Sequence, residues 1–256
     1  MRAGLAALAF AFLPHLAFAQ PAAERCLAGE QRLTDAAPLA RTATLLQTNN
    51  PLRIVAIGSS STRGLWQNDP ARTYPGMLKS ELERLQPGLH VTIVNSGRNA
   101  DTIPGNVARF ERDVFAHKPD LVIWQIGTND LTWLHSSDSL TRRITDGIRH
   151  LKAAGADVVL MDQQYAPVIL ASNYRKMQAS IMEAASQENV PLFSRFELMR
   201  RAVEGGLPMT ALTSIDGLHS SAAGYECTGR ALARAIMAAM PGPQTQTAPA
   251  KRQRSK

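Results

Sequence analysis

The stretch that decides the fold is IVAIGSSSTRG, residues Ile54–Gly64. Four apolar residues, most of them β-branched, run directly into Gly58 and a row of hydroxyl side chains. This pattern predicts a buried strand that ends in a tight turn and opens a helix. In parallel α/β folds, ligands and nucleophiles lie at the carboxyl end of such a strand. Chemistry is therefore expected at Ser59, Ser60 or Ser61, and the stretch alone does not choose among them.

Strand-like runs alternate with longer stretches of helical character along the chain. The strands are expected at 52–57, 90–94, 121–126, 158–161 and 190–193, and the helices at 75–86, 104–116, 139–154, 171–188 and 222–240. Pro75 and Pro104 suit the first turn of a helix, where a missing N–H costs nothing, and Gly155 suits a helix C-terminus. Alternation of this kind predicts a parallel sheet covered on both faces. The expected fold class is α/β, a single three-layer α/β/α sandwich.

Residues 1–19 have the features of a secretory signal peptide. Arg2 precedes an apolar run that ends in Ala17-Phe18-Ala19, which fits cleavage after Ala19. The run is interrupted by Pro14 and is too short to span a bilayer, which takes roughly 20 apolar residues. We therefore expect a periplasmic or secreted protein with no transmembrane segment after cleavage.

The rest of the chain divides into an N-terminal arm (20–50), a folded domain (51–240) and a basic tail (241–256). The arm has no clear period, and the composition of the tail predicts disorder. The formal charge is +7, from 28 basic and 21 acidic residues. Part of that excess lies in the tail, and the body has no basic stripe with interleaved aromatic residues, so no nucleic-acid partner is expected. The oligomeric state is left open.

The two cysteines, Cys26 and Cys227, would reach an oxidising compartment after export. A disulfide there would join the N-terminal arm to the last helix, and we favour this pairing over two unpaired thiols.

Four loops carry glycine and polar residues that a plain connection does not need. Serine attack on a carbonyl requires a base within hydrogen-bond reach and an acceptor that orients the base. Asp216 and His219, three residues apart around a glycine, can supply both. Donors for an oxyanion are also needed, and the Gly97 N–H, the Asn129 amide and the N–H of the nucleophilic serine itself suit that task. The four loops are 58–62, 95–102, 127–130 and 216–219.

Each feature also has a purely structural interpretation. A serine-rich turn is commonly a helix cap, Gly-Thr-Asn-Asp is commonly a turn, and a single histidine commonly satisfies a hydrogen bond near the core. The order and placement of all four loops together favour a catalytic site.

The four loops resemble the four sequence blocks of the SGNH hydrolases, also called the GDSL esterase/lipase family, and the resemblance covers roughly 53–239. It implies a flavodoxin-like sheet ordered 2-1-3-4-5. It also implies that Ser60 is the nucleophile, that Asp216 and His219 complete the triad, and that Ser60, Gly97 and Asn129 form the oxyanion hole. The chain departs from the family pattern at three places. Ser59 replaces the aspartate of Gly-Asp-Ser, Ala100 replaces a usual glycine, and Ser220 stands where proline often follows the histidine.

Several aromatic residues follow strand-end loops and either line an acyl or sugar pocket or simply pack. They are Trp66, Tyr74, Trp133 and Tyr165, with Gln163 and Gln164 as weaker candidates. Histidines and cysteines are scattered, so no metal site is expected, and the implied chemistry requires no cofactor. No Gly-x-Ser-x-Gly or Walker A motif occurs.

Three functions are therefore weighed. The first is an exported serine esterase that hydrolyses an acyl ester, with acetyl one option, of a small molecule, glycan or lipid through an acyl-enzyme. The second is an acyltransferase that uses the same residues with an alcohol in place of water. The third is a non-catalytic flavodoxin-like module that binds a phosphate or FMN at the first loop.

Overall fold

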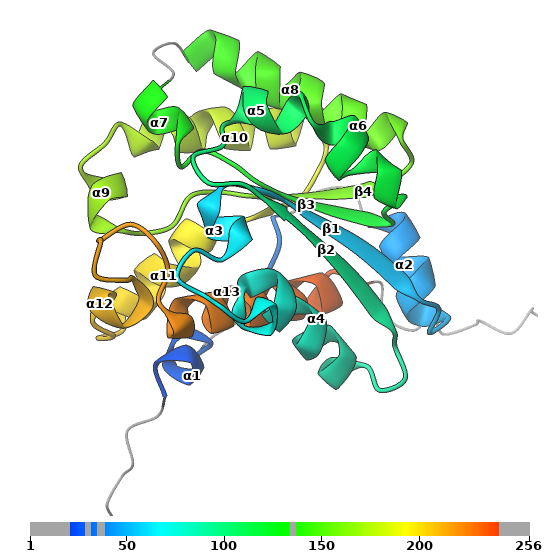
Figure 1. Ribbon diagram of the computed structural model, residues 1–256, viewed down its shortest axis with the longest axis horizontal. Helices are drawn as coiled ribbons and strands as arrows, with labels where there is room; N and C mark the ends of the chain where they lie inside the picture. Colours follow the sequence, from blue (N-terminus) through cyan, green and yellow to red (C-terminus); the bar gives the residue numbers. More distant parts are fainter. Residues whose placement is uncertain (1–20, 29–31, 35–38, 134–136, 241–256) are drawn as a thin grey trace, which may run out of the picture.

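The computed structural model describes residues 21–28, 32–34, 39–133 and 137–240. The predicted signal peptide and basic tail lie outside these residues. Five parallel strands form one sheet in the order β2-β1-β3-β4-β5 (Figure 1). This confirms the predicted fold class and strand order. The strands are β1 (Leu52–Gly58), β2 (Val91–Gly97), β3 (Leu121–Gln125), β4 (Asp157–Met161) and β5 (Leu192–Phe193).

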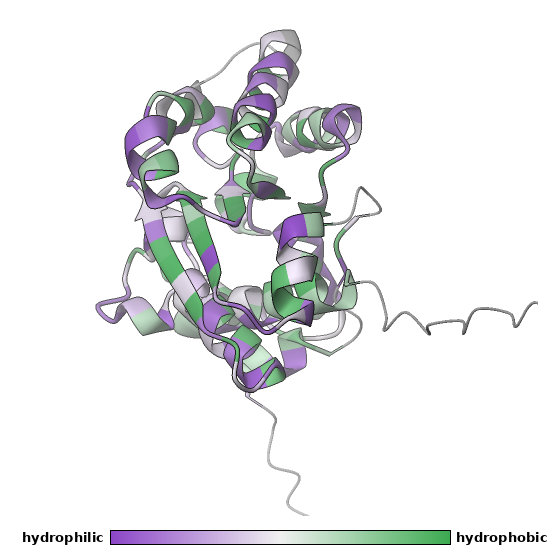
Figure 2. Ribbon diagram, turned by 90° about the vertical axis from the view of Figure 1, so that its right-hand side faces the viewer, coloured by the Kyte–Doolittle hydropathy of each residue, from purple (hydrophilic) through white to green (hydrophobic). Residues whose placement is uncertain are grey.

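Both faces of the sheet are covered, as the apolar run in β1 requires. Ile54 and Ala56 pack into one apolar cluster, and Val55 and Ile57 pack into a second cluster on the opposite face. Successive side chains of a strand point to opposite faces, so a strand buried on both faces shows a continuous apolar run. Figure 2 shows this colour pattern, with apolar residues along the strands and helices that carry both apolar and polar residues.

Helices pack on each face of the sheet (Figure 1). On one face lie α5 (Ile103–Val107), α6 (Phe110–Asp113), α8 (Ser137–Ala153) and α10 (Tyr174–Glu188). On the other lie α1 (Ala22–Cys26), α4 (Tyr74–Leu85), α11 (Arg195–Glu204) and α13 (Ala222–Ala238). The remaining helical segments are α2 (Ala40–Gln47), α3 (Ser60–Arg63), α7 (Asp130–Trp133), α9 (Pro167–Leu170), α12 (Met209–Leu212) and the 3₁₀ turns Pro70–Arg72 and Phe115–His117. Gly155 has φ +81°, as a residue that ends a helix often has.

The single helix predicted over 104–116 is wrong. The chain there forms α5, a break at Ala108 and Arg109, then α6 and a 3₁₀ turn. Arg109 is buried, and its guanidinium donates to Asp101 at 2.7 Å, to Asp113 at 2.9 Å and to the carbonyl of Gly58 at 3.2 Å. The break lets this side chain turn inward, and these tertiary contacts outweigh local helix propensity.

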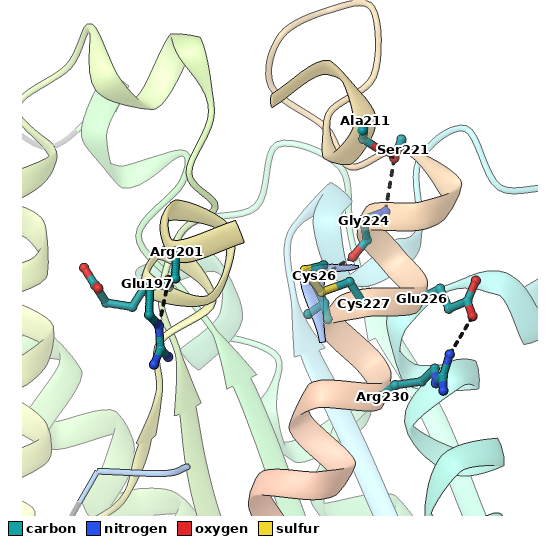
Figure 3. Close-up of a disulfide and its surroundings, with 10 residues drawn as sticks. Cys26, Glu197, Arg201, Ala211, Ser221, Gly224, Glu226, Cys227 and Arg230 are labelled. Carbon is teal, nitrogen blue, oxygen red and sulfur yellow. Dashed lines mark hydrogen bonds and ion pairs between the residues drawn. A yellow bond between two sulfur atoms is a disulfide. The ribbon is translucent and has the colours of Figure 1, made fainter. Parts of the chain in front are cut away.

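The N-terminal arm is more ordered than its lack of period suggested. It contains α1 and α2, and α1 packs against α11, α12 and α13. Figure 3 shows Cys26 of α1 bonded to Cys227 of α13, with a Cα–Cα distance of 6.0 Å, so the predicted disulfide is present. Among the described residues, no helix is both long and apolar enough to cross a membrane.

Candidate active site

The three serines after β1 lie at the start of α3, and their hydroxyl groups have different surroundings. Ser59 is the N-cap residue, and its hydroxyl donates to Oε1 of Gln125 at 3.0 Å. Ser60 Oγ lies 2.8 Å from Nε2 of His219. Ser61 Oγ is buried and has no hydrogen-bond partner among the described residues. Within that part of the chain, Ser60 is thus the serine of the three whose hydroxyl meets a side chain able to accept its proton.

Asp216 and His219 continue this chain of contacts on the turn before α13. Asp216 Oδ2 lies 2.6 Å from His219 Nδ1, and Asp216 Oδ1 accepts the backbone N–H groups of Leu218 and His219 at 3.0 and 2.9 Å. Gly217 has φ +65°, which glycine adopts without strain. Burial alone would raise the pKa of the Asp216 carboxyl, but hydrogen bonds from Leu218, Ser214 and His219 hold that pKa below its usual range. The carboxylate is therefore charged at neutral pH and fixes the imidazole ring.

Gly97 reaches the site because β2 lies directly beside β1. It pairs with Gly58 in the parallel register. A Cβ atom at position 97 would overlap the backbone nitrogen of Arg63, so α3 can approach β2 only over a glycine. The Gly97 N–H donates to Oδ1 of Asn95 at 3.0 Å. The close approach explains the glycine, and its predicted role as an oxyanion donor stays a prediction.

Asn129 follows β3, on the other side of β1. Its Nδ2 donates to the carbonyl of Asp101 at 2.7 Å. The next residue, Asp130, is buried and accepts the N–H groups of Ile103 at 2.8 Å and Gly127 at 3.3 Å. Burial raises the pKa of Asp130, and these two N–H groups oppose that rise. The bonds tie the loop after β3 to the start of α5 and hold Asn129 at the strand end.

Gln125, the last residue of β3, was missed by the sequence analysis. Its Oε1 accepts three hydrogen bonds from the first loop: from the Ser59 N–H at 3.0 Å, the Ser59 hydroxyl at 3.0 Å and the Thr62 hydroxyl at 3.1 Å. The available signal was one polar residue at the end of an otherwise apolar strand. A buried amide with three donors on one oxygen fixes the start of α3 and thereby the position of Ser60.

The aromatic pocket candidates have different surroundings. Tyr74 is fully buried, with its hydroxyl 3.1 Å from Thr62 Oγ1, and burial raises its pKa to about 12, so it packs in the core. Tyr165 is partly buried and packs edge-on against Phe196. The side chain of Trp133 lies outside the described part of the chain. Trp66 is 65% exposed, and its indole N–H donates to Asp216 Oδ2 at 3.1 Å.

Gln164 lies beneath the site rather than in an open pocket. Its Nε2 donates to the carbonyl of Leu218 at 2.8 Å, and its Oε1 accepts from Arg195 at 2.8 Å and from the Thr128 hydroxyl at 3.2 Å. Burial lowers the pKa of Arg195. Gln164 thus connects the loop after β3 to the turn that carries His219. Gln163 is also buried.

The comparison with protein families gives a match over most of the chain. The model of the non-GDSL lipase-like family matches residues 25–241. The chain belongs to this family. The match includes part of the N-terminal arm and all four candidate loops, and with the observed sheet it confirms the resemblance to the SGNH hydrolases.

Individual relatives of this family member are distant. An arylesterase of Vibrio mimicus is 29% identical over 115 residues, which are 45% of this chain and 56% of the relative. The two-domain esterase CEX, active on acetylated mannans, superposes with a TM-score of 0.71 at 19% identity, covering 90% of this chain and 59% of CEX. The acetylxylan esterase Axe2 of Geobacillus stearothermophilus gives 0.61 at 22% identity, covering 72% and 94%. The chain therefore spans somewhat more than half of the arylesterase and of CEX, and these structures show a shared fold.

Proposed function

We propose that this chain is a serine esterase whose triad is Ser60, His219 and Asp216. The observation that carries the proposal is the continuous relay from Ser60 Oγ to His219 Nε2 at 2.8 Å and from His219 Nδ1 to Asp216 Oδ2 at 2.6 Å. A serine in a helix cap needs no histidine, and a ligand-binding loop needs no carboxylate behind that histidine. Nucleophilic catalysis uses all three groups.

The reaction follows from this geometry. Ser60 Oγ attacks the ester carbonyl while His219 Nε2 takes the hydroxyl proton. The tetrahedral intermediate collapses, the C–O bond to the alcohol breaks, and His219 returns the proton to the leaving alcohol. Water then gives a proton to His219 and attacks the acyl-enzyme. The acyl–Oγ bond breaks, the acid is released, and His219 returns the proton to Ser60 Oγ. Asp216 stays ionised throughout and orients the imidazole.

We assign the oxyanion donors to the N–H groups of Ser60 and Gly97 and to the Asn129 amide. In the resting chain the Gly97 N–H donates to Asn95 and the Asn129 Nδ2 donates to the carbonyl of Asp101. The single N–H of Gly97 must therefore leave or share its partner as charge develops on the carbonyl oxygen, whereas the Asn129 amide has two N–H groups and the bond to Asp101 uses one of them. Loss of the Asn129 amide should lower turnover about 100- to 1,000-fold, the usual effect of removing one oxyanion donor.

We further propose that the substrate is an acetyl ester of a polysaccharide and that the protein works outside the cytoplasm. Two proteins that share its fold act on such esters: CEX is an esterase active on acetylated mannans, and Axe2 is an acetylxylan esterase. The disulfide between Cys26 and Cys227 supports an oxidising compartment, and the signal peptide predicted for residues 1–19 agrees with it.

The experiment is hydrolysis of p-nitrophenyl esters of increasing acyl length, followed by release of acetate from acetylated mannan and xylan. Ser60→Ala should abolish turnover, and the matched variants Ser59→Ala and Ser61→Ala should keep most of it. Equal activity of the wild type and Ser60→Ala, or loss of activity in Ser59→Ala alone, contradicts the assignment. A preference for long acyl chains over acetyl contradicts the substrate class but leaves the triad intact.

A further inference from the structure

Trp66 is unusual in both its backbone and its exposure. Its φ is +71°, in the left-handed region that residues other than glycine rarely adopt and that costs about 1 kcal/mol or more. Its side chain is 65% exposed, although tryptophan is usually largely buried. Burial in the core therefore does not explain why a large aromatic residue occupies this strained position.

The surrounding chain holds Trp66 in place. The Leu65 N–H donates to the carbonyl of Ser60 at 3.1 Å, and the Leu65 carbonyl accepts the Tyr225 hydroxyl at 3.1 Å. The Gln67 N–H donates to the carbonyl of Gly64 at 2.9 Å, which closes a turn around Trp66. The segment is thus fixed to α3 on one side and to α13 on the other, one helical turn beyond Ser60.

This fixed segment places the indole N–H on the carboxylate of Asp216. The indole donates to Oδ2 at 3.1 Å, the same oxygen that faces His219 Nδ1 at 2.6 Å. The other oxygen, Oδ1, accepts the Ser214 hydroxyl at 2.7 Å and the N–H groups of Leu218 and His219. A carboxylate offers about four acceptor positions, so five donors saturate it. The bond from Trp66 crosses 150 positions of sequence. It ties the segment that follows the three serines (64–67, the serine segment) to the turn that carries Asp216 and His219 (214–219, the aspartate turn).

We propose that Trp66 is a positioning residue that acts on catalysis through Asp216. Its indole N–H prevents rotation of the carboxylate and withdraws negative charge from Oδ2, which sets how strongly the aspartate holds the protonated His219. Because the proposal concerns the same triad, it rests on the proposed function. The strained backbone and the exposed ring are explained together, since both are needed to bring an N–H from the serine segment to the outer side of Asp216.

The test compares Trp66→Phe, which keeps an aromatic ring but has no N–H, with the wild type on p-nitrophenyl acetate. We expect kcat to fall about tenfold, the usual order for one lost hydrogen bond to a charged group, with KM little changed. Without the competing donor, Oδ2 holds the protonated imidazole more tightly, so the acid limb of the kcat/KM profile moves to higher pH. Among the described residues, two further groups act on the Asp216–His219 pair. The Ser214 hydroxyl donates to Asp216, and the Tyr225 hydroxyl, whose pKa is raised by burial, interacts electrostatically with Asp216. Trp66→Phe changes neither group.

Two controls separate positioning from shape. Replacement of Trp66 by 3-benzothienylalanine, which has sulfur in place of the N–H and nearly the same outline, should reproduce the effect of Trp66→Phe. Val168→Ala should leave the pH profile unchanged. Val168 is an exposed residue of α9 whose backbone N–H donates to the Gly217 carbonyl at 3.3 Å, next to Asp216. Wild-type kinetics in the benzothienyl protein, or an effect confined to KM, overturns the proposal.

A second readout does not depend on turnover. A proton on His219 Nδ1 should give a downfield NMR signal, because Nδ1 lies only 2.6 Å from Asp216 Oδ2. We expect this signal to shift in Trp66→Phe and not in Val168→Ala, even if the chain hydrolyses none of the esters tried. An unchanged signal in Trp66→Phe counts against positioning, whereas a shifted signal without esterase activity contradicts the proposed function alone.

Discussion

Ser59 is buried at the point where the strand β1 becomes the helix α3, and its hydroxyl has two partners. It donates to Gln125 Oε1 at 3.0 Å and accepts the Ser61 N–H at 3.4 Å. An ionised aspartate can accept hydrogen bonds but cannot donate one. The Ser59 hydroxyl can therefore donate to the Gln125 oxygen, which an ionised aspartate at this position could not do. This hydrogen bond accounts for the serine that this chain has in place of the aspartate of Gly-Asp-Ser.

Restoring the family's aspartate should therefore harm this chain. Ser59→Asp places a carboxylate against the Gln125 oxygen in a buried position, and we expect it to lower the free energy of unfolding by about 2 kcal/mol or more. Ser59→Ala removes one hydrogen bond and should cost about 1 kcal/mol. Urea unfolding at neutral pH measures both. A Ser59→Asp protein as stable as the wild type would show that the Gln125 amide turns around without cost.

Ala100 is a second departure that the structure makes testable. Its φ is +58°, a conformation strained for alanine and free for glycine. Ala100→Gly should therefore raise the free energy of unfolding by about 0.5–1 kcal/mol. The matched control is Ala108→Gly, at an exposed position with φ −60°, where glycine should lower the free energy of unfolding by a similar amount. If thermal unfolding shows that both variants change the stability in the same direction, the strain at Ala100 is contradicted.

The three residues that form the Ser60–His219–Asp216 contacts could be predicted from sequence. The residues that hold them in position, Gln125 and Trp66, could not. Ser60 and the Asp216–His219 pair occur in short motifs at strand ends, where chemistry is expected. Gln125 and the indole of Trp66 act through contacts between segments that are 66 and 150 residues apart. No local pattern marks a residue whose partner is fixed only by the fold.

The packing of α4 against α13 depends on one close approach and one charge cluster. A Cβ atom on Gly229 would clash with Met77 and with the carbonyl of Tyr74, so the two helices meet over a glycine. Beside this contact, the buried Glu81 accepts from Arg84 at 2.7 Å and from Arg234 at 3.0 Å. The cluster joins α4 and α13, two of the helices that cover one face of the sheet.

Glu81→Gln should destabilise this helix pair in a way that depends on pH. Burial alone would raise the pKa of Glu81, but the bonds from Arg84 and Arg234 and the charge of Arg230 hold it below its usual range. A pKa lowered by folding stabilises the fold above the unfolded value of about 4.3 and loses that effect as the pH falls further. We expect Glu81→Gln to lower the free energy of unfolding by about 2 kcal/mol at pH 7, and by less below pH ~4.

The control for this charge cluster is Glu226→Gln, which removes a partner of Arg230 on α13 whose side chain is 39% exposed, against 3% for Glu81. Pairs near the surface contribute about 0–1 kcal/mol, so this variant should be nearly as stable as the wild type at both pH values. Denaturant unfolding at pH 7 and pH 3.5 measures the stability of both variants against that of the wild type. If Glu81→Gln loses the same stability at both pH values, the glutamate contributes by packing and not by charge.

Among the elements, strands were predicted better than helices. Each predicted strand overlaps an observed one. The reason is clearest for β1, β3 and β4, whose apolar, largely β-branched runs are buried on both faces of the sheet. The helix α11 and the short α12 were missed, and the arm was expected to be irregular, although it contains α1 and α2. These helices are short or polar, and tertiary packing stabilises them more than their own periodicity does.

Over the whole molecule, parallel order brings the four loops together. The strands β2 and β3 flank β1, so the ends of all three strands share one edge of the sheet, and the turn before α13 supplies the histidine. That turn lies between α12 and α13, and α1 packs against both helices. The disulfide between Cys26 and Cys227 therefore fixes the arm to the two helices that carry the ends of the aspartate turn.

Removing this disulfide should affect stability more than catalysis. The crosslink closes a loop of 201 residues, and long loops lose the most chain entropy on crosslinking, so the double variant Cys26→Ala and Cys227→Ala should lose about 3–5 kcal/mol. For a chain of this size, that corresponds to a fall in Tm of about 10 °C. Both cysteines are buried, so substitution is a cleaner test than a reductant added to the folded protein.

We expect kcat on p-nitrophenyl acetate at 25 °C to stay within about twofold of wild type, because the Ser60–His219–Asp216 contacts do not involve α1. Equal midpoints of thermal inactivation for the two proteins would contradict the role of the crosslink. A large loss of kcat well below the new Tm would instead show that α1 holds the aspartate turn in its active geometry.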